Sequence, residues 1–336
     1  MNIVKTTNLT TNNQTAQDST ASMTARRIIG SYEGQTHGDL FLVITTLHGN
    51  EPAGSSAVQT ALNLLNKEKS EKPDFDFKGK IVGLIGNLAA QKANKRYIDT
   101  DMNRLWQPER IEAILAQTDE KKLLSEEREV RELLAAIYQE VDSYKPVKVY
   151  ILDLHTTTAE GGIFTITPDN SDEALRIALT LFAPVITGFS DLLKGTLTSF
   201  FNKECAGLPC TTLTFESGQH LSQEAVTNAV SVIINILRAV NFVNAADVED
   251  KHDALLRARA ATLPRQARLL YRHPIQALDR FVMKPGYQNF QRIAAKEIIA
   301  EDRKGVIRAQ KDCLILMPLY QTQGNDGFFL IEVVEE

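Results

Sequence analysis

Four residues that could take part in metal-dependent catalysis follow apolar, strand-like segments of the chain. His48 and Glu51 come after the run DLFLVITTL, His155 comes after VYILDL, and Glu216 comes after TTLTF. Two imidazoles and one carboxylate form a known type of catalytic zinc site, in which three protein ligands leave the fourth position for water or substrate. The pattern predicts that His48, Glu51 and His155 bind one Zn²⁺ per chain.

Two further carboxylates have positions that suit hydrolysis at such a site. Zinc lowers the pKa of bound water toward about 7, and Glu216 could act as the general base that takes its proton and passes it to a leaving nitrogen. Asp153 lies two residues before His155, on the same face of the expected strand, and could orient the imidazole. From spacing alone, a solvent-facing or sheet-capping Asp153 is an equally good interpretation.

The segment KRYIDTDMNRLW, residues 95–106, concentrates charged and polar side chains between the two halves of this site. Arg104 with Asn103 could grip a substrate carboxylate in planar, bidentate geometry, and Arg96 could stabilise the oxyanion of a tetrahedral intermediate. Loops rich in Asp and Arg are usually solvated turns. The residue types alone therefore leave both interpretations open.

The order of the apolar runs predicts the elements that bring these residues together. Strand-like runs alternate with segments of helical periodicity, which indicates an α/β fold with a mixed, mostly parallel sheet flanked by helices. In such sheets ligands bind beyond the carboxyl ends of the strands, where the four residues above would meet. The polar turn at His37 and Gly38, between RRIIGSYEG and DLFLVITTL, predicts a hairpin.

Three regions of different composition divide the chain. Residues 1–24 are rich in Thr, Asn, Gln and Ser and predict a disordered polar tail without a secretory signal. Residues 25–245 carry the alternating pattern of the α/β catalytic domain. Residues 246–336 consist of short apolar runs broken by Pro, Gly and Asp turns, which predicts a C-terminal antiparallel β domain that caps the site.

The composition limits the partners and the compartment. The 336 residues are 43% hydrophobic and 24% charged, with a net charge of −5, so a globular protein is expected. No basic cluster or long apolar run is present, which argues against nucleic acid and membrane as partners. Three cysteines without a paired C-x₂-C motif suit a reducing cytoplasm. Self-association into a homo-oligomer stays open.

Four ordered motifs carry a resemblance to a known family. HGNE, RYIDTDMNR, DLHTTT and ESG follow one another in the order and at the separations found in the succinylglutamate desuccinylase and aspartoacylase family, relatives of the zinc carboxypeptidases. The C-terminal segment that begins MKPGYQNFQRIAAKEIIAEDRKGVIRAQKDC is also similar to the β domain of bacterial members. The resemblance extends over residues from about 26 to 336.

This resemblance implies a carboxypeptidase-like α/β domain whose C-terminal β domain narrows access to the site. It implies hydrolysis of a small N-acyl amino acid to a free acid and an amino acid. Transferred position by position, it implies that zinc is bound by His48, Glu51 and His155, that Glu216 is the general acid and base, and that Arg96 polarises the scissile carbonyl.

The resemblance further implies that Asn103 and Arg104 bind the α-carboxylate of the amino-acid portion. Aspartoacylases place an Arg about ten residues before the catalytic Glu, to hold the side-chain carboxylate of N-acetylaspartate. Here that stretch reads SFFNKECAGLPCTTLTFE and has no Arg, although Lys194 or Lys203 could substitute as a point charge. Tyr287 could reach the pocket from the C-terminal domain.

Two rival functions fit the same residues. A metallocarboxypeptidase that trims short peptides would use the same metal set and carboxylate clamp, but it needs an open groove. A non-catalytic binding protein with the same fold would often have lost a ligand or the base, whereas every implied position is occupied here. Of the other histidines, His220 could lie near the pocket because it follows Glu216 by four residues.

Overall fold

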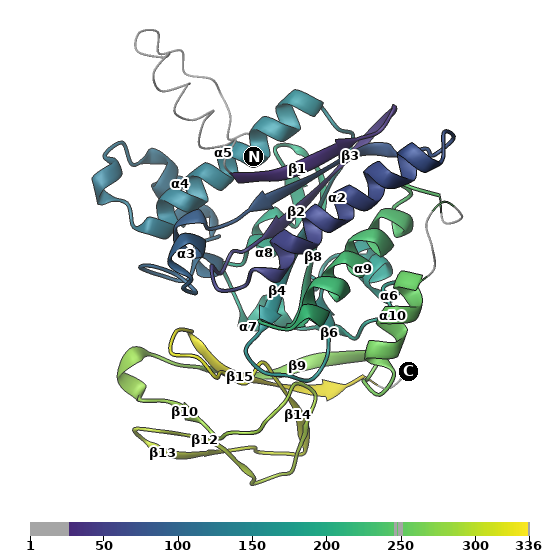
Figure 1. Ribbon diagram of the computed structural model, residues 1–336. Helices are drawn as coiled ribbons and strands as arrows, with labels where there is room; N and C mark the ends of the chain where they lie inside the picture. The colour runs from purple at the N-terminus through teal and green to yellow at the C-terminus, as the bar shows by residue number, and fades with distance from the viewer. Residues whose placement is uncertain (1–26, 245–246, 248–250, 335–336) are drawn as a thin grey trace.

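One large twisted sheet runs through most of the molecule. The computed structural model describes residues 27–244, 247 and 251–334, so the predicted tail over 1–24 lies outside the described residues (Figure 1). Within them the sheet has twelve strands. Their order is β1 (Ile28–Glu33), β3 (Lys78–Ile85), β2 (Thr36–Thr45), β4 (Val149–Thr157), β8 (Leu208–Gln219), β5 (Phe164–Ile166), β6 (Val185–Thr187), β9 (Gln266–Pro274), β15 (Asp326–Val333), β14 (Cys313–Leu316) and β11 (Arg292–Ile293), while β7 (Lys203–Cys205) pairs with β8 beside this path.

The centre of the sheet is parallel, as the alternating pattern predicts. Strand β2 pairs in parallel with β3 and β4, and β4 pairs in parallel with β8. The predicted hairpin between β1 and β2 is wrong, because β1 pairs antiparallel with β3, which therefore lies between them. The physical reason is that both edges of β2 pair with apolar parallel strands, so β1 has only the outer edge of β3 to pair with.

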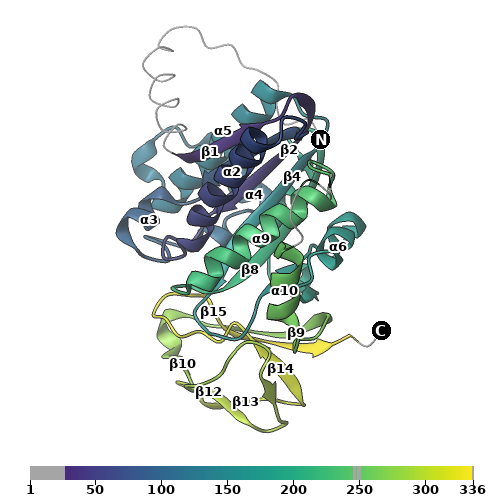
Figure 2. The same ribbon diagram turned by 45° about the vertical axis from the view of Figure 1, so that its right-hand side comes forward.

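Helices cover both faces of the parallel centre (Figures 1 and 2). On one face, α2 and α9 share an apolar cluster with Phe41 and Val43; on the other, α4 and α5 share one with Leu40, Leu42 and Ile44. Alternation of side chains along β2 explains why both faces are apolar. The described helices are α2 (Ala53–Glu71), α3 (Leu88–Ala93), α4 (Pro108–Ala116), α5 (Ser125–Tyr144), α6 (Asp172–Leu179), α7 (Phe189–Leu192), α8 (Leu197–Phe201), α9 (Gln223–Ala239) and α10 (Lys251–Ala260).

None of the helices in the described part of the chain has both the length and the apolar run that a membrane crossing requires. Helices α2, α4, α5 and α6 are amphipathic, with an apolar side buried and a polar or charged side in solvent. The α/β fold class with helices on a mostly parallel sheet, followed by antiparallel strands, is confirmed.

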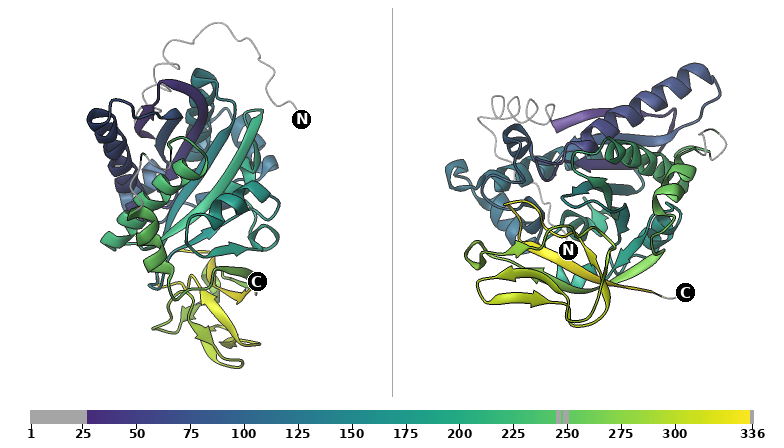
Figure 3. Two further views of the ribbon diagram at one scale, coloured as in Figure 1. Left: turned by 90° about the vertical axis from the view of Figure 1, so that its right-hand side faces the viewer. Right: turned by 60° about the horizontal axis from the view of Figure 1, so that its bottom comes forward.

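The C-terminal strands extend the same large sheet. Strand β6 pairs in parallel with β9, and β9, β15, β14 and β11 then continue the sheet as antiparallel neighbours. A separate antiparallel sheet holds β10 (Val282–Met283), β12 (Ile298–Asp302) and β13 (Gly305–Arg308). In Figure 3 this C-terminal part, drawn in light green and yellow, lies at one end of the α/β body. The division into two domains at residue 245 stays a prediction, since one sheet runs through both segments.

Candidate active site

The four residues singled out by the sequence gather at the carboxyl ends of β2, β4 and β8. His48 and Glu51 lie in the turn that follows β2, while His155 and Glu216 lie on neighbouring strands and face each other in register. All four side chains are buried, with exposed fractions of 2 to 6%. The parallel topology explains the convergence, since parallel strands end at the same edge of the sheet.

His48, Glu51 and His155 form a group that could hold a metal ion. The Glu51 carboxylate lies between the imidazoles, with Oε1 2.8 Å from His48 Nδ1 and Oε2 3.1 Å from His155 Nδ1. One ligand atom from each residue lies within 4.8 Å of the other two. Two imidazole nitrogens and one carboxylate oxygen at these separations suit a small divalent ion.

The charges in this group depend on one another. Burial opposes the charge of Glu51, but His48 and His155 outweigh burial and hold the pKa of that carboxyl well below its usual range. Burial likewise opposes the charge of His155, and Asp153 with Glu51 outweighs it, so the pKa of the imidazole lies well above its ordinary value. Without a bound cation, a proton on the His155 imidazole compensates the buried charges of Asp153 and Glu51. A metal ion at this place would supply that positive charge instead.

A carboxylate orients each of the two imidazoles from behind. His155 Nε2 lies 2.9 Å from Asp153 Oδ2, and His48 Nε2 lies 3.1 Å from Asp101 Oδ1. Both carboxylates are fully buried. In metal sites such a partner fixes the tautomer and raises the basicity of the ligand. The sequence indicates Asp153 by its spacing from His155. It does not indicate Asp101, which lies in the polar segment 95–106, because no local spacing links that residue to His48.

The turn that carries His48 and Glu51 needs the glycine between them. Gly49 lies so close to helix α3 that a Cβ atom there would come within 2.0 Å of the carbonyl carbon of Ala90. The Gly49 amide donates to the carbonyl of Arg96 at 3.2 Å. This close backbone approach joins the metal-ligand turn to the segment that carries the arginines.

Glu216 is a buried carboxyl group without a hydrogen-bond partner on Oε2. Burial raises its pKa to about 8, and the nearby charges of Glu51 and Asp153 act in the same direction, against His155 and Arg96. A carboxyl whose pKa lies near neutrality can exchange a proton at physiological pH. Glu216 lies beside His48, Glu51 and His155, which is the position that the sequence predicts for a general base.

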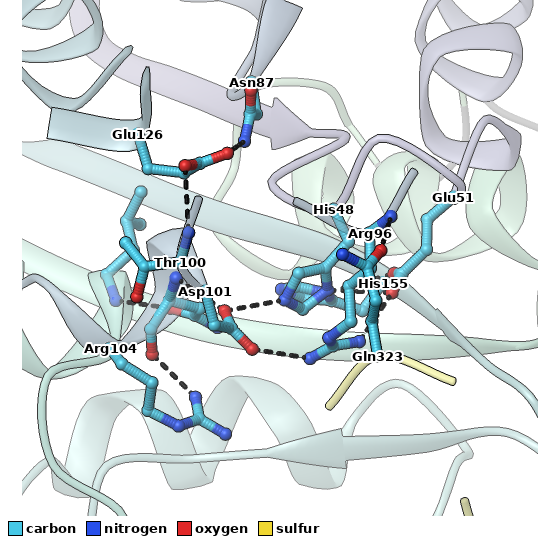
Figure 4. Close-up of polar contacts among 12 residues, drawn as sticks. His48, Glu51, Asn87, Arg96, Thr100, Asp101, Arg104, Glu126, His155 and Gln323 are labelled. Atoms are coloured by element: carbon cyan, nitrogen blue, oxygen red, sulfur yellow. Dashed lines mark hydrogen bonds and ion pairs between the residues drawn. The ribbon is translucent and has the colours of Figure 1, made fainter. Parts of the chain in front are cut away.

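Arg96 contacts two carboxylates in and beside the candidate metal site, those of Glu51 and Asp101. Its Nη2 donates to Asp101 Oδ2 at 3.0 Å, and its Nη1 lies 3.6 Å from Glu51 Oε1. Burial disfavours the guanidinium charge, but Asp101 and Glu51 outweigh it, so the pKa of Arg96 is raised and the group stays cationic. Figure 4 shows the two oxygens of Asp101 facing His48 and Arg96.

Asn103 and Arg104 also line the cavity, but the structure gives Arg104 a partner that the sequence does not indicate. Its Nη2 pairs with Asp326 of β15, and its Nη1 donates to the Asn103 carbonyl at 2.6 Å. The Asn103 side-chain oxygen accepts from the Leu197 amide at 2.9 Å, so its amide nitrogen is the group that could donate to a substrate. Asp326 also pairs with Arg272 of β9.

Two residues from distant elements hold the backbone of this segment (Figure 4). Glu126 of α5 accepts hydrogen bonds from three consecutive backbone amides, those of Ile98, Asp99 and Thr100, at 2.7 to 3.1 Å. Gln323, from the C-terminal segment, accepts from the Arg96 amide at 3.2 Å and donates to the Tyr97 carbonyl at 3.0 Å. Neither residue carries a local sequence signal.

These residues surround a cavity of about 130 Å³, whose wall is completed by the C-terminal segment, including Met317, Leu319 and Phe329. His220 lines the cavity, with Nδ1 2.7 Å from Thr156 Oγ1.

Other residues considered from the sequence lie elsewhere. Tyr287 does not line the cavity. Its hydroxyl lies within the C-terminal segment, where it contacts Glu297 and the Ile298 carbonyl. Lys194 and Lys203 are exposed and are absent from the lining as well. No lysine therefore replaces the missing arginine along this wall.

Known proteins resemble this chain both in sequence and in fold. A probable aspartoacylase of Parasynechococcus marenigrum (strain WH8102) is 34% identical over 122 residues, which are 36% of this chain and 35% of that protein. This match thus spans about a third of the relative's length.

Among solved structures, a succinylglutamate desuccinylase from Vibrio cholerae superposes with a TM-score of 0.56 at 16% identity, covering 88% of this chain and 81% of the other. A product-bound ectoine utilization protein from Ruegeria pomeroyi gives 0.58 at 13%, covering 90% and 87%. At such identities the likeness shows the fold alone.

The family model of the succinylglutamate desuccinylase/aspartoacylase catalytic domain matches residues 38–240. That range includes the turn after β2, the segment with both arginines, and the ends of β4 and β8. It covers more than half of the chain, and it confirms the resemblance that the four motifs carry. The chain therefore belongs to the succinylglutamate desuccinylase and aspartoacylase family of deacylases.

Proposed function

We propose that this protein is a zinc-dependent deacylase that hydrolyses the amide bond of a small N-acyl amino acid. One observation carries the proposal: a buried group of two imidazoles and a carboxylate faces a cavity beside Glu216, a buried carboxyl with one unpartnered oxygen. Family membership supports deacylation as the reaction class.

The donor set fits zinc. His48 and His155 would supply nitrogen and Glu51 oxygen, and each imidazole already has its second nitrogen against a carboxylate. One ion per chain would replace the proton that compensates the buried charge here. When bound, zinc supplies Lewis-acid polarisation of a carbonyl and acidifies water.

Glu216 would move the proton in both halves of the reaction. As a carboxylate it removes a proton from the attacking water, and as the resulting acid it protonates the departing amine. Burial keeps the pKa of Glu216 near 8, so both protonation states are accessible at neutral pH.

The two arginines would have different functions. Arg96 stays cationic and lies against the metal group, so it could stabilise the oxyanion that develops on the carbonyl oxygen, an effect worth about 10²- to 10³-fold in rate. Arg104, with the amide of Asn103, would hold the α-carboxylate of the substrate away from the reacting bond.

The size of the cavity supports a small substrate over a peptide. Its volume of about 130 Å³ lies below the roughly 300 to 1,000 Å³ of sites for drug-sized ligands. The C-terminal segment forms part of its wall, where a carboxypeptidase would need an open groove.

We also propose a reducing, cytoplasmic location, because all three cysteines are free thiols. Nucleic acid is not an expected partner, and self-association stays open.

The test is an amine-release assay on N-acetyl and N-succinyl amino acids and short peptides, with metal analysis of the same preparation. We expect about one zinc per chain, and activity that a chelator removes and zinc restores. Glu216→Gln should retain the metal and lose at least about 100-fold in kcat. His48→Ala should lose the metal itself.

Glu112→Gln serves as the matched control, because Glu112 is an exposed glutamate on α4. It should retain both activity and metal. Less than a tenth of an equivalent of any divalent metal would contradict the proposal, and so would full activity of Glu216→Gln.

A further inference from the structure

The cavity has two guanidinium groups, and each already faces a carboxylate. Arg96 pairs with Asp101, and Arg104 pairs with Asp326. No lysine and no third arginine occurs among the residues that line the cavity. In the deacylase proposed above, Arg104 would hold the α-carboxylate and Arg96 the reacting carbonyl, so no cation is left for a second carboxylate.

Apart from the carboxylates of Glu51, Glu216 and Asp326 and the imidazoles, the rest of the wall carries no charge, and one side of it is apolar. Phe189 and Phe329 pack with ring centroids 5.4 Å apart, and Ile166, Leu193 and Met317 complete the same apolar cluster. The other polar side chains of the wall are uncharged hydroxyl and amide groups, and some of the hydroxyls bond to one another, as Thr196 does with Ser199 at 2.7 Å. Such a surface stabilises hydrocarbon and offers a carboxylate no charged partner.

Asp326 makes the cavity still less favourable for a second anion. It lines the wall from β15, and its carboxylate lies between Arg104 and Arg272, accepting from both. Its side chain is only 8% exposed. With Arg104 and Arg272 it forms a group of two cations and one anion, whose single net positive charge matches one substrate carboxylate on Arg104. A second anionic group beside Asp326 would then be repelled.

We propose that the substrate carries a single carboxylate, and that the group which distinguishes it from other N-acyl amino acids is uncharged and mainly apolar. Asp326 is the residue that sets this specificity. The inference rests on the proposed deacylase function and names the substrate class of that same site. It separates this chain from enzymes that select N-acylated aspartate or glutamate.

A pair of substrates of nearly equal size tests the inference on the zinc-loaded full-length protein. N-acetyl-L-methionine and N-acetyl-L-glutamate differ mainly by one charge, and N-succinyl-L-glutamate adds a further carboxylate. We expect kcat/KM for the methionine derivative to exceed that for the glutamate derivative by at least about 100-fold, because a site without a partner for a charged group rejects it strongly.

A binding measurement makes the same comparison without turnover. In the Glu216→Gln variant, titration calorimetry should give a lower Kd for N-acetyl-L-methionine than for N-acetyl-L-glutamate. Equal affinities, or tighter binding of the glutamate derivative, would overturn the inference.

Asp326→Asn tests the specificity role. The amide keeps the shape but removes the charge, so the kcat/KM ratio of the methionine to the glutamate derivative should fall by about tenfold or more, a change of ~1.4 kcal/mol or more. Glu301→Gln, an exposed neutralisation on β12, should leave the ratio unchanged. An unchanged ratio in Asp326→Asn would overturn this role.

The outcomes separate the inference from the proposed function. Faster hydrolysis of N-acetyl-L-glutamate or N-succinyl-L-glutamate than of the methionine derivative overturns the inference alone. Release of no amine from any substrate by the zinc-loaded protein overturns the proposed function, and the inference falls with it.

Discussion

Asp101 contacts both a proposed metal ligand and a proposed catalytic cation. Its Oδ1 lies 3.1 Å from His48 Nε2, and its Oδ2 accepts from Arg96 at 3.0 Å. Burial opposes its charge, but Arg96 and His48 outweigh burial and hold the pKa of Asp101 well below its usual range. One carboxylate therefore links the orientation of a ligand to that of the arginine.

We expect Asp101→Asn to weaken zinc binding by about 10- to 100-fold, because the amide is a poorer partner for the ligand imidazole. Competition with a chromophoric chelator measures the affinity. Glu112→Gln should bind zinc like the parent protein. An unchanged zinc affinity in Asp101→Asn would show that His48 needs no carboxylate behind it.

The raised pKa of Glu216 predicts how the stability of the metal-free protein depends on pH. The folded protein keeps the Glu216 proton up to about pH 8, whereas the unfolded chain loses it near 4.5. Unfolding therefore releases a proton between these values, and the stability contribution of Glu216 falls as pH rises through that window. Glu216→Gln has no such proton.

We therefore expect Glu216→Gln to gain stability over the parent by a few kcal/mol more at pH 8 than at pH 5, from ~1.4 kcal/mol per pKa unit. Thermal or denaturant unfolding in the presence of a chelator measures this difference. If the variant and the parent differ equally at both pH values, Glu216 has an ordinary pKa in the folded protein.

At the scale of elements, helix α5 positions the segment that carries both arginines. The Glu126 carboxylate is fully buried and accepts from the amides of Ile98, Asp99 and Thr100, and from the Asn87 side chain at 3.3 Å. Helix α5 packs on the sheet, so these hydrogen bonds fix the backbone of the segment 98–100 relative to the sheet.

Glu126→Gln would place an amide NH₂ against backbone donors, so at least one amide of the segment loses its acceptor. We expect a lower free energy of unfolding by about 1–3 kcal/mol and a kcat reduced by about tenfold or more, with zinc content retained. Asp142→Asn, an exposed change on the same helix, is the control. Unchanged kcat in a stable Glu126→Gln protein would mean that Arg96 is held without this contact.

The sequence predicts those parts of the site that depend on strand ends. Apolar runs followed by His48, His155 and Glu216 are local patterns, and parallel pairing makes their meeting a consequence of the fold class. Glu126 could not be found in this way, because it lies on a helix rich in charged residues and only the tertiary structure tells it apart from solvated neighbours. The prediction of a β1–β2 hairpin is wrong for a related reason. The partner of each strand depends on all the strands of the sheet, and here β3 takes the edge of β2 that β1 would need.

At the scale of the whole molecule, the C-terminal segment completes the site through side chains far away in sequence. Gln321 accepts from Asn50 at 2.8 Å, Gln323 holds the Arg96 and Tyr97 backbone, and Asp326 pairs with Arg104. The sequence predicted that this segment caps the site but named only Tyr287. These pairs are separated by more than 200 positions, and no pattern in either partner indicates the other.

Gln323→Ala tests whether the C-terminal segment positions Arg96. Loss of two hydrogen bonds, each worth about 0.5–1.5 kcal/mol, should loosen the Arg96 backbone and lower kcat by roughly tenfold while KM and zinc content change little. The exposed neighbour Thr322→Ala is the control. In an Arg96→Ala background, Gln323→Ala should cost little further activity, because the contact would have no guanidinium left to position. Independent, multiplicative effects of the two changes would instead mean that Gln323 acts on the site by another route.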